Sequence, residues 1–192
     1  GLEGIAISRS HMVDCRNAAK IEFSQVEVAA DALLGEVDAG FDGLDKVLDI
    51  ARIGLAAEML GSIQEVFERI LDFLKTREQF GILIGSFQGL QHRAATMYSE
   101  IELCKSVVRA ALAGLDDSGK SRQDIAELAS IAKAKLSEVF FEVSNEGIQM
   151  HGGIGMTDEF DIGFFLKRAR VAQHFLGDAS FHRDRYASLN NF

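Results

Sequence analysis

The sequence predicts a mainly α-helical protein, in which an up-down four-helix-type bundle follows a few β-strands. Apolar residues from about residue 40 onward recur with a period near 3.6, which is typical of amphipathic helices. Residues 1 to about 35 instead alternate apolar and polar side chains, as half-buried strands do. The helical stretches are long and their connections short, which favours antiparallel neighbours in a bundle. We therefore place one domain boundary near residue 38, between residues 1–38 and 39–192.

Two strands are expected at the start of the chain, over Gly4–Ser8 and Ala19–Val28, with the turn-like Asp14–Asn17 between them. A sheet of two strands is only marginally stable in water, so these strands need partners that the sequence does not supply. The chain also begins at Gly1, within strand-like sequence. We therefore expect it to be part of a larger protein whose sheet is incomplete here.

Two long helices are expected next. The first begins at Gly40 and continues for about thirty residues. Its predicted apolar face consists of Leu44, Leu48, Ala51, Leu55, Met59, Ile63, Val66, Ile70 and Phe73. The second helix ends at the loop-forming Asp116–Gly119. Its predicted apolar face consists of Leu90, Met97, Ile101, Cys104, Val108, Ala111 and Leu115.

The start of the third helix is marked by Ser121 and Asp124, which are spaced as a capping-box pair. The helical pattern continues to a glycine-rich segment, Gln149–Thr157. The predicted apolar face of this helix consists of Ile125, Leu128, Ala132, Leu136, Val139 and Val143. A shorter fourth helix is expected over roughly Asp161–Leu176, and a last one after Ser180.

The composition argues against several classes of partner and site. The chain has 192 residues with 20 basic and 29 acidic side chains, and its net charge of −9 disfavours nucleic acid or an anionic membrane as partner. No apolar run approaches membrane-spanning length. Cys15 and Cys104 are far apart, so neither a disulfide framework nor a zinc site is indicated, and a cytoplasmic location is expected. His174 and His182 match no zinc pattern, so no metal site is expected.

The segment Gln149–Thr157 carries three glycines within four positions, at Gly152, Gly153 and Gly155. Glycine lets the backbone approach a ligand closely and present its N–H groups to a phosphate. The same sequence is also compatible with a helix C-cap followed by a turn. Glycine content alone favours the cap and turn, and the surrounding sequence is what favours a binding role.

The surrounding sequence resembles the acyl-CoA dehydrogenase family. Arg77–Gly81, Phe87-Gln88, the glycine-rich segment, Arg168–Arg170 and Gly177 stand in the order and spacing of that family. The resemblance covers essentially the whole chain. It implies the C-terminal half of such an enzyme, with the last strands of an incomplete β-barrel domain and the C-terminal helical bundle. The ending Gly177–Arg183 resembles small subunits of heteromeric bacterial acyl-CoA dehydrogenases.

The resemblance implies a FAD-dependent oxidoreductase that acts on the CH–CH bond next to an acyl-CoA thioester. Its implied partners are acyl-CoA, same-family subunits in a dimer or tetramer, and an electron-transfer flavoprotein; this chain alone is expected to be inactive. The implied flavin contacts, made mainly to a neighbouring subunit, are Arg77, Phe80, Phe87, Gln88, Gln149, Met150, His151, Gly152, Gly153, Asp178 and Ser180. The implied substrate contacts are Asp49, Arg52 and Gly177.

Simpler roles are open for some of these side chains. Arg77 near a helix end interacts favourably with the helix dipole, and Asp49 with Arg52 forms an i, i+3 ion pair on a helix. The nearby Phe80 and Phe87-Gln88 favour the flavin role for Arg77. For Asp49 and Arg52 the two interpretations are evenly balanced.

The positions that hold the catalytic base in this family lack a carboxylate. Removing a proton next to a thioester carbonyl requires a carboxylate in an apolar pocket. The family normally places a glutamate directly before the glycine that corresponds to Gly177, and a minority places it in the first long helix; this chain has Leu176 and Ala51 there. Either Asp178 or Asp49 is a displaced base, or another subunit supplies the base, or the chain only binds and scaffolds.

Two other functions are compatible with the same sequence. One is a helical dimerisation or scaffold module without chemistry, which would contain no flavin. The other is a flavin-dependent oxidase or monooxygenase on the same fold, in which the flavin would be reoxidised by air without an electron acceptor.

Overall fold

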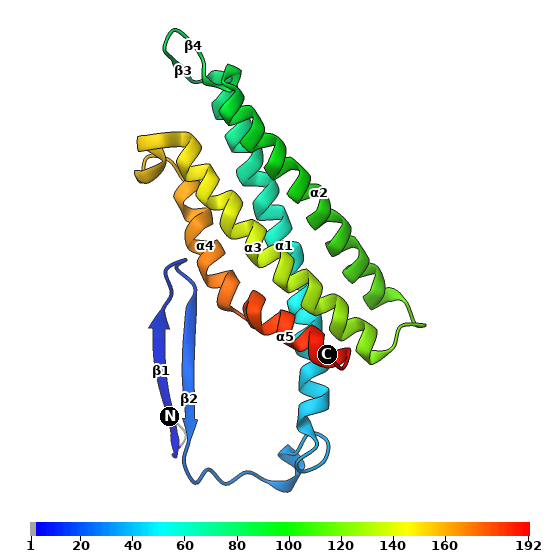
Figure 1. Ribbon diagram of the computed structural model, residues 1–192. Coiled ribbons are helices and arrows are strands. Elements are labelled where there is room, and N and C mark those ends of the chain that lie inside the picture. Colours follow the sequence, from blue (N-terminus) through cyan, green and yellow to red (C-terminus); the bar gives the residue numbers. More distant parts are fainter. Residues whose placement is uncertain (1–2) are drawn as a thin grey trace.

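The computed structural model describes residues 3–192 and consists of a β-hairpin and a helical bundle (Figure 1). The hairpin is formed by β1 (Ile5–His11) and β2 (Asn17–Phe23). The long helices are α1 (Gly40–Thr76), α2 (Gln88–Asp116), α3 (Arg122–His151), α4 (Ile162–His174) and α5 (Ala179–Leu189). The short elements are η1 (Ala30–Ala32), β3 (Glu78–Gln79), β4 (Ile82–Leu83), η2 (Ile84–Ser86) and η3 (Gly152–Met156). The predicted mainly α fold, an up-down bundle preceded by strands, is confirmed.

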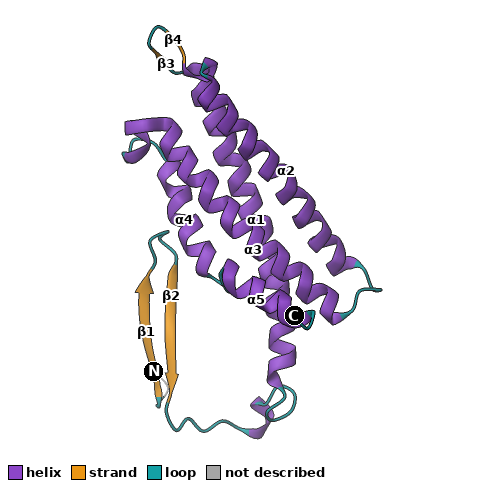
Figure 2. Ribbon diagram, in the orientation of Figure 1, coloured by secondary structure: helices purple, strands orange, loops and turns teal. Residues whose placement is uncertain are grey.

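The helix α3 lies at the centre of the bundle. It packs against α1, α2, α4 and α5; α1 to α4 run in alternating directions, and α5 continues in the direction of α4 (Figures 1 and 2). The buried residues of α3 include several small ones: Ala126, Ala129, Ala132 and Ala134. They let the neighbouring helices approach closely, in keeping with the dense packing of protein interiors. The shared core consists mainly of Ile53, Met59, Ile63, Val66, Ile70, Met97, Ile101, Cys104, Val108, Leu136, Val139, Phe140 and Val143.

The predicted apolar face of α1 is correct along most of the helix and wrong at its start. The helix has 37 residues, rather than about thirty, and its first turns extend beyond the bundle (Figure 1). Leu44 is therefore 54% exposed, and Ala51 is also exposed. Farther along, Leu55, Met59 and Ile63 are buried as predicted. The periodicity gives the apolar stripe, but the length of the neighbouring helices decides where the stripe is covered.

The hairpin pairs its strands in antiparallel register from Ile5↔Phe23 to His11↔Asn17. The predicted strand Ala19–Val28 thus begins two residues earlier and ends five residues earlier than expected, and the N–H of Ser24 donates to the Gly4 carbonyl oxygen at 2.8 Å just past its end. The side chains of β2 are exposed along its whole length. The turn between the strands contacts the bundle through ion pairs: Asp14 with Arg168 at 2.9 Å, and Arg16 with Glu58 at 3.3 Å.

The start of α3 has the predicted capping box. The backbone N–H of Asp124 donates to Ser121 Oγ at 3.1 Å, and the Asp124 carboxylate accepts from the backbone N–H of Ser121 at 2.8 Å. The two bonds satisfy backbone donors that the first turn of a helix leaves unpaired. Within residues 3–192, no helix is both long and apolar enough to span a bilayer.

Replacing Ser121 with alanine removes one side of this capping box. We expect the free energy of unfolding to fall by about 1 kcal/mol, the usual loss for an N-cap serine. Urea denaturation followed by circular dichroism measures the change. Ser106→Ala is the matched control, because Ser106 is an exposed serine in the middle of α2 whose hydroxyl only contacts the Glu102 carbonyl. Equal effects of the two substitutions would contradict the capping role.

Candidate functional site

A strained hairpin turn projects from the end of the bundle, between β3 and β4 (Figure 1). Its two central residues, Phe80 and Gly81, have φ angles of 57° and 79°, as a type I′ turn requires. A left-handed conformation is unfavourable for phenylalanine, and Phe80 is also 92% exposed. The left-handed backbone and the exposed aromatic ring of Phe80 each lower the stability of the isolated chain. Such unfavourable features are typical of functional positions.

The other predicted residues of this region gather around the turn. The ring of Phe87 contacts Phe80 edge-on, with centroids 6.1 Å apart, and the exposed Gln88 begins α2. Arg77 ends α1, and its backbone is fixed by hydrogen bonds to Phe73 and Ile84. Its side chain is exposed, and its guanidinium forms no ion pair within residues 3–192. An arginine donor, two aromatic rings and an amide thus face the same end of the bundle.

The glycine-rich segment is only partly a loop. α3 continues through His151, and Gly152 ends it before the single turn η3. Met150 and His151 are each 5% exposed, so their side chains belong to the core, whereas Gln149, Gly152 and Gly153 are exposed. The flavin contacts predicted for Met150 and His151 stay predictions, and backbone atoms rather than these buried side chains would have to make them. The amphipathic pattern of α3 extends to His151, into the first residues of the glycine-rich segment.

His151 connects the two predicted parts of the flavin site. Its Nδ1 donates to the Gly147 carbonyl oxygen at 2.7 Å, and its ring stacks on Phe73 with centroids 4.3 Å apart. Burial lowers the pKa of His151, so the ring is neutral at pH 7. Phe73 lies one helical turn before Arg77. The end of α1 and the end of α3 thus meet at the same end of the bundle.

A second unusual turn joins α4 to α5. Leu176 and Gly177 both have left-handed backbones, with φ angles of 63° and 101°. Only glycine fits at position 177, because a Cβ atom there would lie 2.4 Å from Cδ1 of Phe181. The Leu176 carbonyl oxygen accepts hydrogen bonds from Arg52 Nε at 3.3 Å and from His182 Nε2 at 3.0 Å. The backbone of this turn is therefore fixed whatever side chain residue 176 carries.

Lys133 is the residue of this site that sequence reasoning missed. It is completely buried in α3, and its Nζ donates to Gly177 O at 2.7 Å, Ser137 Oγ at 2.9 Å and Gln173 O at 3.2 Å. Burial lowers the pKa of Lys133 to about 8, and the charge of Arg52 acts in the same direction. The sequence contains one indication of this buried lysine: Lys133 lies on the same side of the predicted helix as Ser130 and Ser137, which gives that side three polar residues.

Asp49 and Arg52 are the buried members of a larger group of charges, here called the Asp–Arg cluster: Asp45, Asp49, Arg52, Arg122 and Arg185. The Asp49 carboxylate accepts from Arg52 at 2.7 Å, from Arg122 at 2.5 Å and from Arg185 at 2.8 and 3.0 Å. Burial raises the pKa of Asp49, but these hydrogen bonds outweigh it and hold the pKa below its ordinary value. The predicted i, i+3 pair is thus one part of a larger network.

Both alternative candidates for the base have a carboxyl group whose pKa is lowered by its hydrogen bonds. Asp49 is 0% exposed and held by three arginines, which makes it a poor proton acceptor. Asp178 caps α5, with Oδ1 accepting from the Phe181 N–H at 2.8 Å, and this bond lowers its pKa. Leu176 packs against the core and Ala51 is exposed on α1. Ser180, in the first turn of α5, is exposed.

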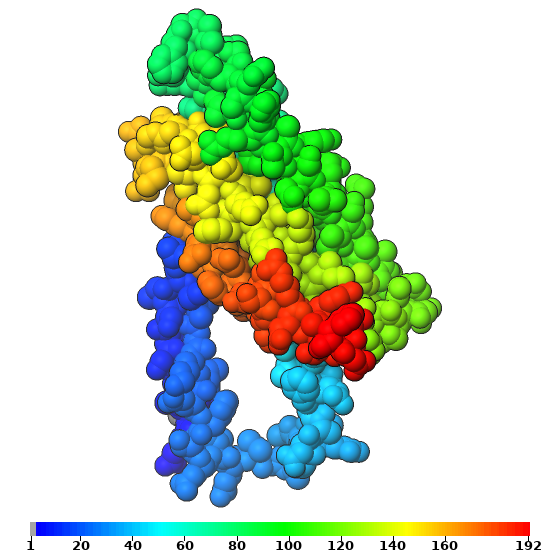
Figure 3. All heavy atoms as spheres, in the orientation of Figure 1, coloured from blue at the N-terminus to red at the C-terminus, as the bar shows by residue number. Residues whose placement is uncertain are grey.

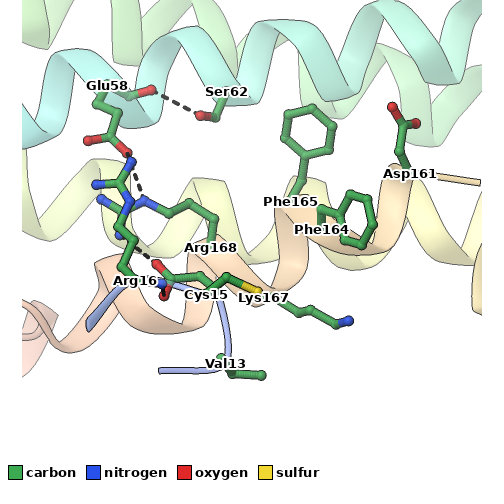
Figure 4. A pocket seen from close by; sticks show the side chains of 11 residues that line it. Val13, Cys15, Arg16, Glu58, Ser62, Asp161, Phe164, Phe165, Lys167 and Arg168 are labelled. Atoms are coloured by element: carbon green, nitrogen blue, oxygen red, sulfur yellow. Dashed lines mark hydrogen bonds and ion pairs between the residues drawn. The ribbon is translucent and has the colours of Figure 1, made fainter. Parts of the chain in front are cut away.

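A cavity of about 670 Å³ lies elsewhere, between the β1–β2 turn, α1 and α4 (Figure 4). Phe164 and Phe165 form its apolar wall, and Arg16 and Arg168 meet Glu58 on its other side. It contains none of the residues for which the sequence predicts a role. Within residues 3–192, no three or more His, Cys, Asp or Glu side chains are arranged to hold a metal ion.

Comparison with known proteins identifies the family. Residues 38–188 match the family model "Acyl-CoA dehydrogenase, C-terminal domain". The chain belongs to the acyl-CoA dehydrogenase family. Known members of this family are oxidoreductases and flavoproteins. The predicted resemblance is therefore confirmed.

Individual relatives agree with this assignment. The chain is 29% identical over 173 residues to the caffeyl-CoA reductase–Etf complex subunit CarC of Acetobacterium woodii, covering 88% of this chain and 44% of that protein. It is 32% identical over 181 residues to the mitochondrial short/branched chain specific acyl-CoA dehydrogenase of Rattus norvegicus, covering 93% and 41%. The butyryl-CoA dehydrogenase structure from Megasphaera elsdenii has a TM-score of 0.90 at 26% identity, covering 100% and 50%. The chain thus spans half or less of each of these proteins.

The environment of Lys133 predicts a specific pH dependence of stability. Because its pKa falls from 10.5 in the unfolded chain to about 8 in the folded one, the unfolded chain binds more protons between these pH values. This residue's contribution therefore makes stability rise with pH across the window. Urea denaturation at several pH values should give a steeper rise for the wild type than for Lys133→Met. Lys135→Met, at a half-buried lysine on the same helix whose Nζ pairs with the Glu100 carboxylate, is the control; equal slopes for all three proteins would contradict the assignment.

Proposed function

We propose that this chain is part of an FAD-dependent acyl-CoA dehydrogenase subunit that lacks its own catalytic base and acts with a same-family subunit that carries one. The observation that supports this best is the turn at Leu176–Asp178. Its strained backbone and its hydrogen bonds to Arg52, His182 and Lys133 are those of a built site, yet the residue at the usual position of the base is an apolar leucine. The division of the chain into residues 1–38 and 39–192 is part of the same proposal.

The residues at the hairpin end of the bundle suit the pyrophosphate and adenine of a flavin. Arg77 would donate paired hydrogen bonds to phosphate, because a guanidinium matches the spacing of two phosphate oxygens. Phe80 and Phe87 would stack against the adenine ring, and Gln88 and Gln149 would add amide hydrogen bonds. Gly152 and Gly153 would bring backbone close to the ligand. All of these side chains are at least partly exposed, so they suit a flavin held by a neighbouring subunit.

The proposed reaction needs a carboxylate to take the proton from the carbon next to the thioester carbonyl, and bound FAD would supply the acceptor for the hydride of the following carbon. Leu176 and Ala51 cannot take a proton, and the arginine contacts of Asp49 and the capping bond of Asp178 make both carboxylates poor proton acceptors. We therefore assign the base to another subunit. This chain's own contribution is to orient the flavin, with Asp178 and Ser180 beside the turn as further contacts.

The proposed partners are acyl-CoA, a same-family subunit and an electron-transfer flavoprotein, in the cytoplasm. One relative, CarC, is named as a subunit of an Etf complex, which supports an electron-transfer flavoprotein as the acceptor. Bound FAD would pass the electrons taken from the substrate on to that protein. A scaffold without flavin and an oxidase on the same fold are the outcomes that would replace this proposal.

Arg77→Ala in the full-length protein that carries this chain should lower FAD retention. We expect at least a tenfold loss of FAD affinity, because each charge-assisted hydrogen bond contributes about 1.5–3 kcal/mol. Flavin absorbance after gel filtration measures the occupancy. Arg109→Ala, at an exposed arginine on α2, is the control. Full occupancy in Arg77→Ala would contradict the assignment of this end of the bundle to FAD.

Flavin bleaching tests which subunit supplies the catalytic base. We would record the flavin absorbance of the full-length protein, alone and with its same-family genomic neighbour, before and after adding a panel of acyl-CoA esters. Bleaching only in the presence of the neighbour is expected, because the base lies there. Bleaching by the protein alone would place the base within this subunit. Absence of flavin from both preparations would favour the scaffold, and reoxidation in air without an acceptor would favour the oxidase.

A further inference from the structure

The cavity between the β1–β2 turn, α1 and α4 has an apolar side and a charged side (Figure 4). Phe164 and Phe165, from the first turn of α4, form the apolar side, and Phe164 is 56% exposed. The volume of about 670 Å³ is typical of small-molecule sites, which are mostly apolar with a few polar groups. No residue proposed to contact flavin or acyl-CoA lines this cavity, so a ligand here would belong to a separate site.

The carboxylates that line the cavity are all paired within the chain. Each has at least one arginine partner: Asp14 with Arg168, Glu58 with Arg168 and Arg16, and Asp161 with Arg69. Opposite charges in contact compensate one another, so the cavity contains no unpaired negative charge that would repel an anion.

Two of the cations that line the cavity have donors to spare. The Arg16 side chain is 60% exposed, and within residues 3–192 its guanidinium makes one contact, from Nη2 to Glu58 Oε1 at 3.3 Å. Arg168 already donates to the same oxygen at 2.7 Å. Lys167 forms no ion pair among the described residues, and its Nζ lies 5.4 Å from the centroid of the Phe164 ring. The unpaired donors of this cavity are therefore positively charged and lie next to its aromatic side.

We propose that this cavity binds a small aromatic monocarboxylate, with the carboxylate at Arg16 and the ring against Phe164 and Phe165. A guanidinium with free N–H groups matches the two oxygens of a carboxylate. Aromatic rings pack favourably against one another, which selects a flat apolar body. The chain's net charge of −9 disfavours a multiply charged anion such as a nucleotide. This site does not depend on the proposed function.

Calorimetric titration of the full-length protein that carries this chain with naphthoate tests the ligand class. We expect saturable binding that Arg16→Gln weakens at least about fivefold, because the variant loses the charge-assisted hydrogen bonds. The control is Arg9→Gln, at an exposed arginine of the same hairpin that does not line the cavity, and its affinity should stay within about twofold of the wild type. Naphthamide, which has the ring without the charge, should not distinguish Arg16→Gln from the wild type. Absence of naphthoate binding, or equal naphthoate affinities of Arg16→Gln and the wild type, would overturn the proposal.

Alkylation of Cys15 tests the place of binding. Cys15 is exposed and lines the cavity, whereas Cys104 is buried. Iodoacetamide labelling followed by peptide mass spectrometry measures the rate at Cys15 with and without saturating naphthoate. We expect naphthoate to slow the reaction at least about threefold, because thiol reactivity depends on access to the reagent. An unchanged rate would place naphthoate elsewhere and overturn the proposal. A Cys15 that does not react even without naphthoate would show that other parts of the full-length protein fill the cavity, which would also overturn it.

Discussion

The arrangement of this chain depends on pairing the charged side chains that lie between α1, α3 and α5. Three arginines meet two aspartates in the Asp–Arg cluster, and Lys133 beside them holds the turn that leads into α5. A buried charge without partners is strongly unfavourable, so each group restricts where the others can lie. α5 is short and contributes few buried apolar side chains, Ala179 being one, and its position is therefore determined largely by Arg185 and His182.

The charged groups near α5 pair mainly with one another, whereas several polar and aromatic groups at the hairpin end are exposed and available to a ligand. Around α5 and the Leu176–Asp178 turn, the carbonyl oxygens of residues 176 and 177 and the Asp49 carboxylate have partners within the chain, whereas the buried Nδ1 of His182 has none. At the hairpin end, a strained turn keeps Phe80 in solvent beside an arginine without an ion pair among the described residues. Exposed groups without partners are available to a ligand, which is why we assign most of the proposed flavin contacts to the hairpin end of the bundle.

The turn before α5 shows how a site's backbone can be kept without its chemistry. Arg52, His182 and Lys133 all bind carbonyl oxygens of the turn, and Gly177 avoids a clash with Phe181. These contacts place no requirement on the side chain of residue 176, which packs as an apolar residue against the core. A carboxylate could therefore be replaced by leucine without loss of the local fold, and a subunit of this kind stays compatible with same-family partners.

The sequence by itself determined the helices, the capping box at Ser121 and the family, because periodicity, capping and motif spacing are local properties of the chain. It also showed that Leu176 and Ala51 cannot be bases. Only the tertiary structure decided that Met150 and His151 are buried, that the start of α1 is uncovered, and that Asp49 is shared by Arg52, Arg122 and Arg185. Arg122 and Arg185 lie 73 and 136 positions from Asp49. Contacts at such separations follow from helix packing, which local sequence patterns do not specify.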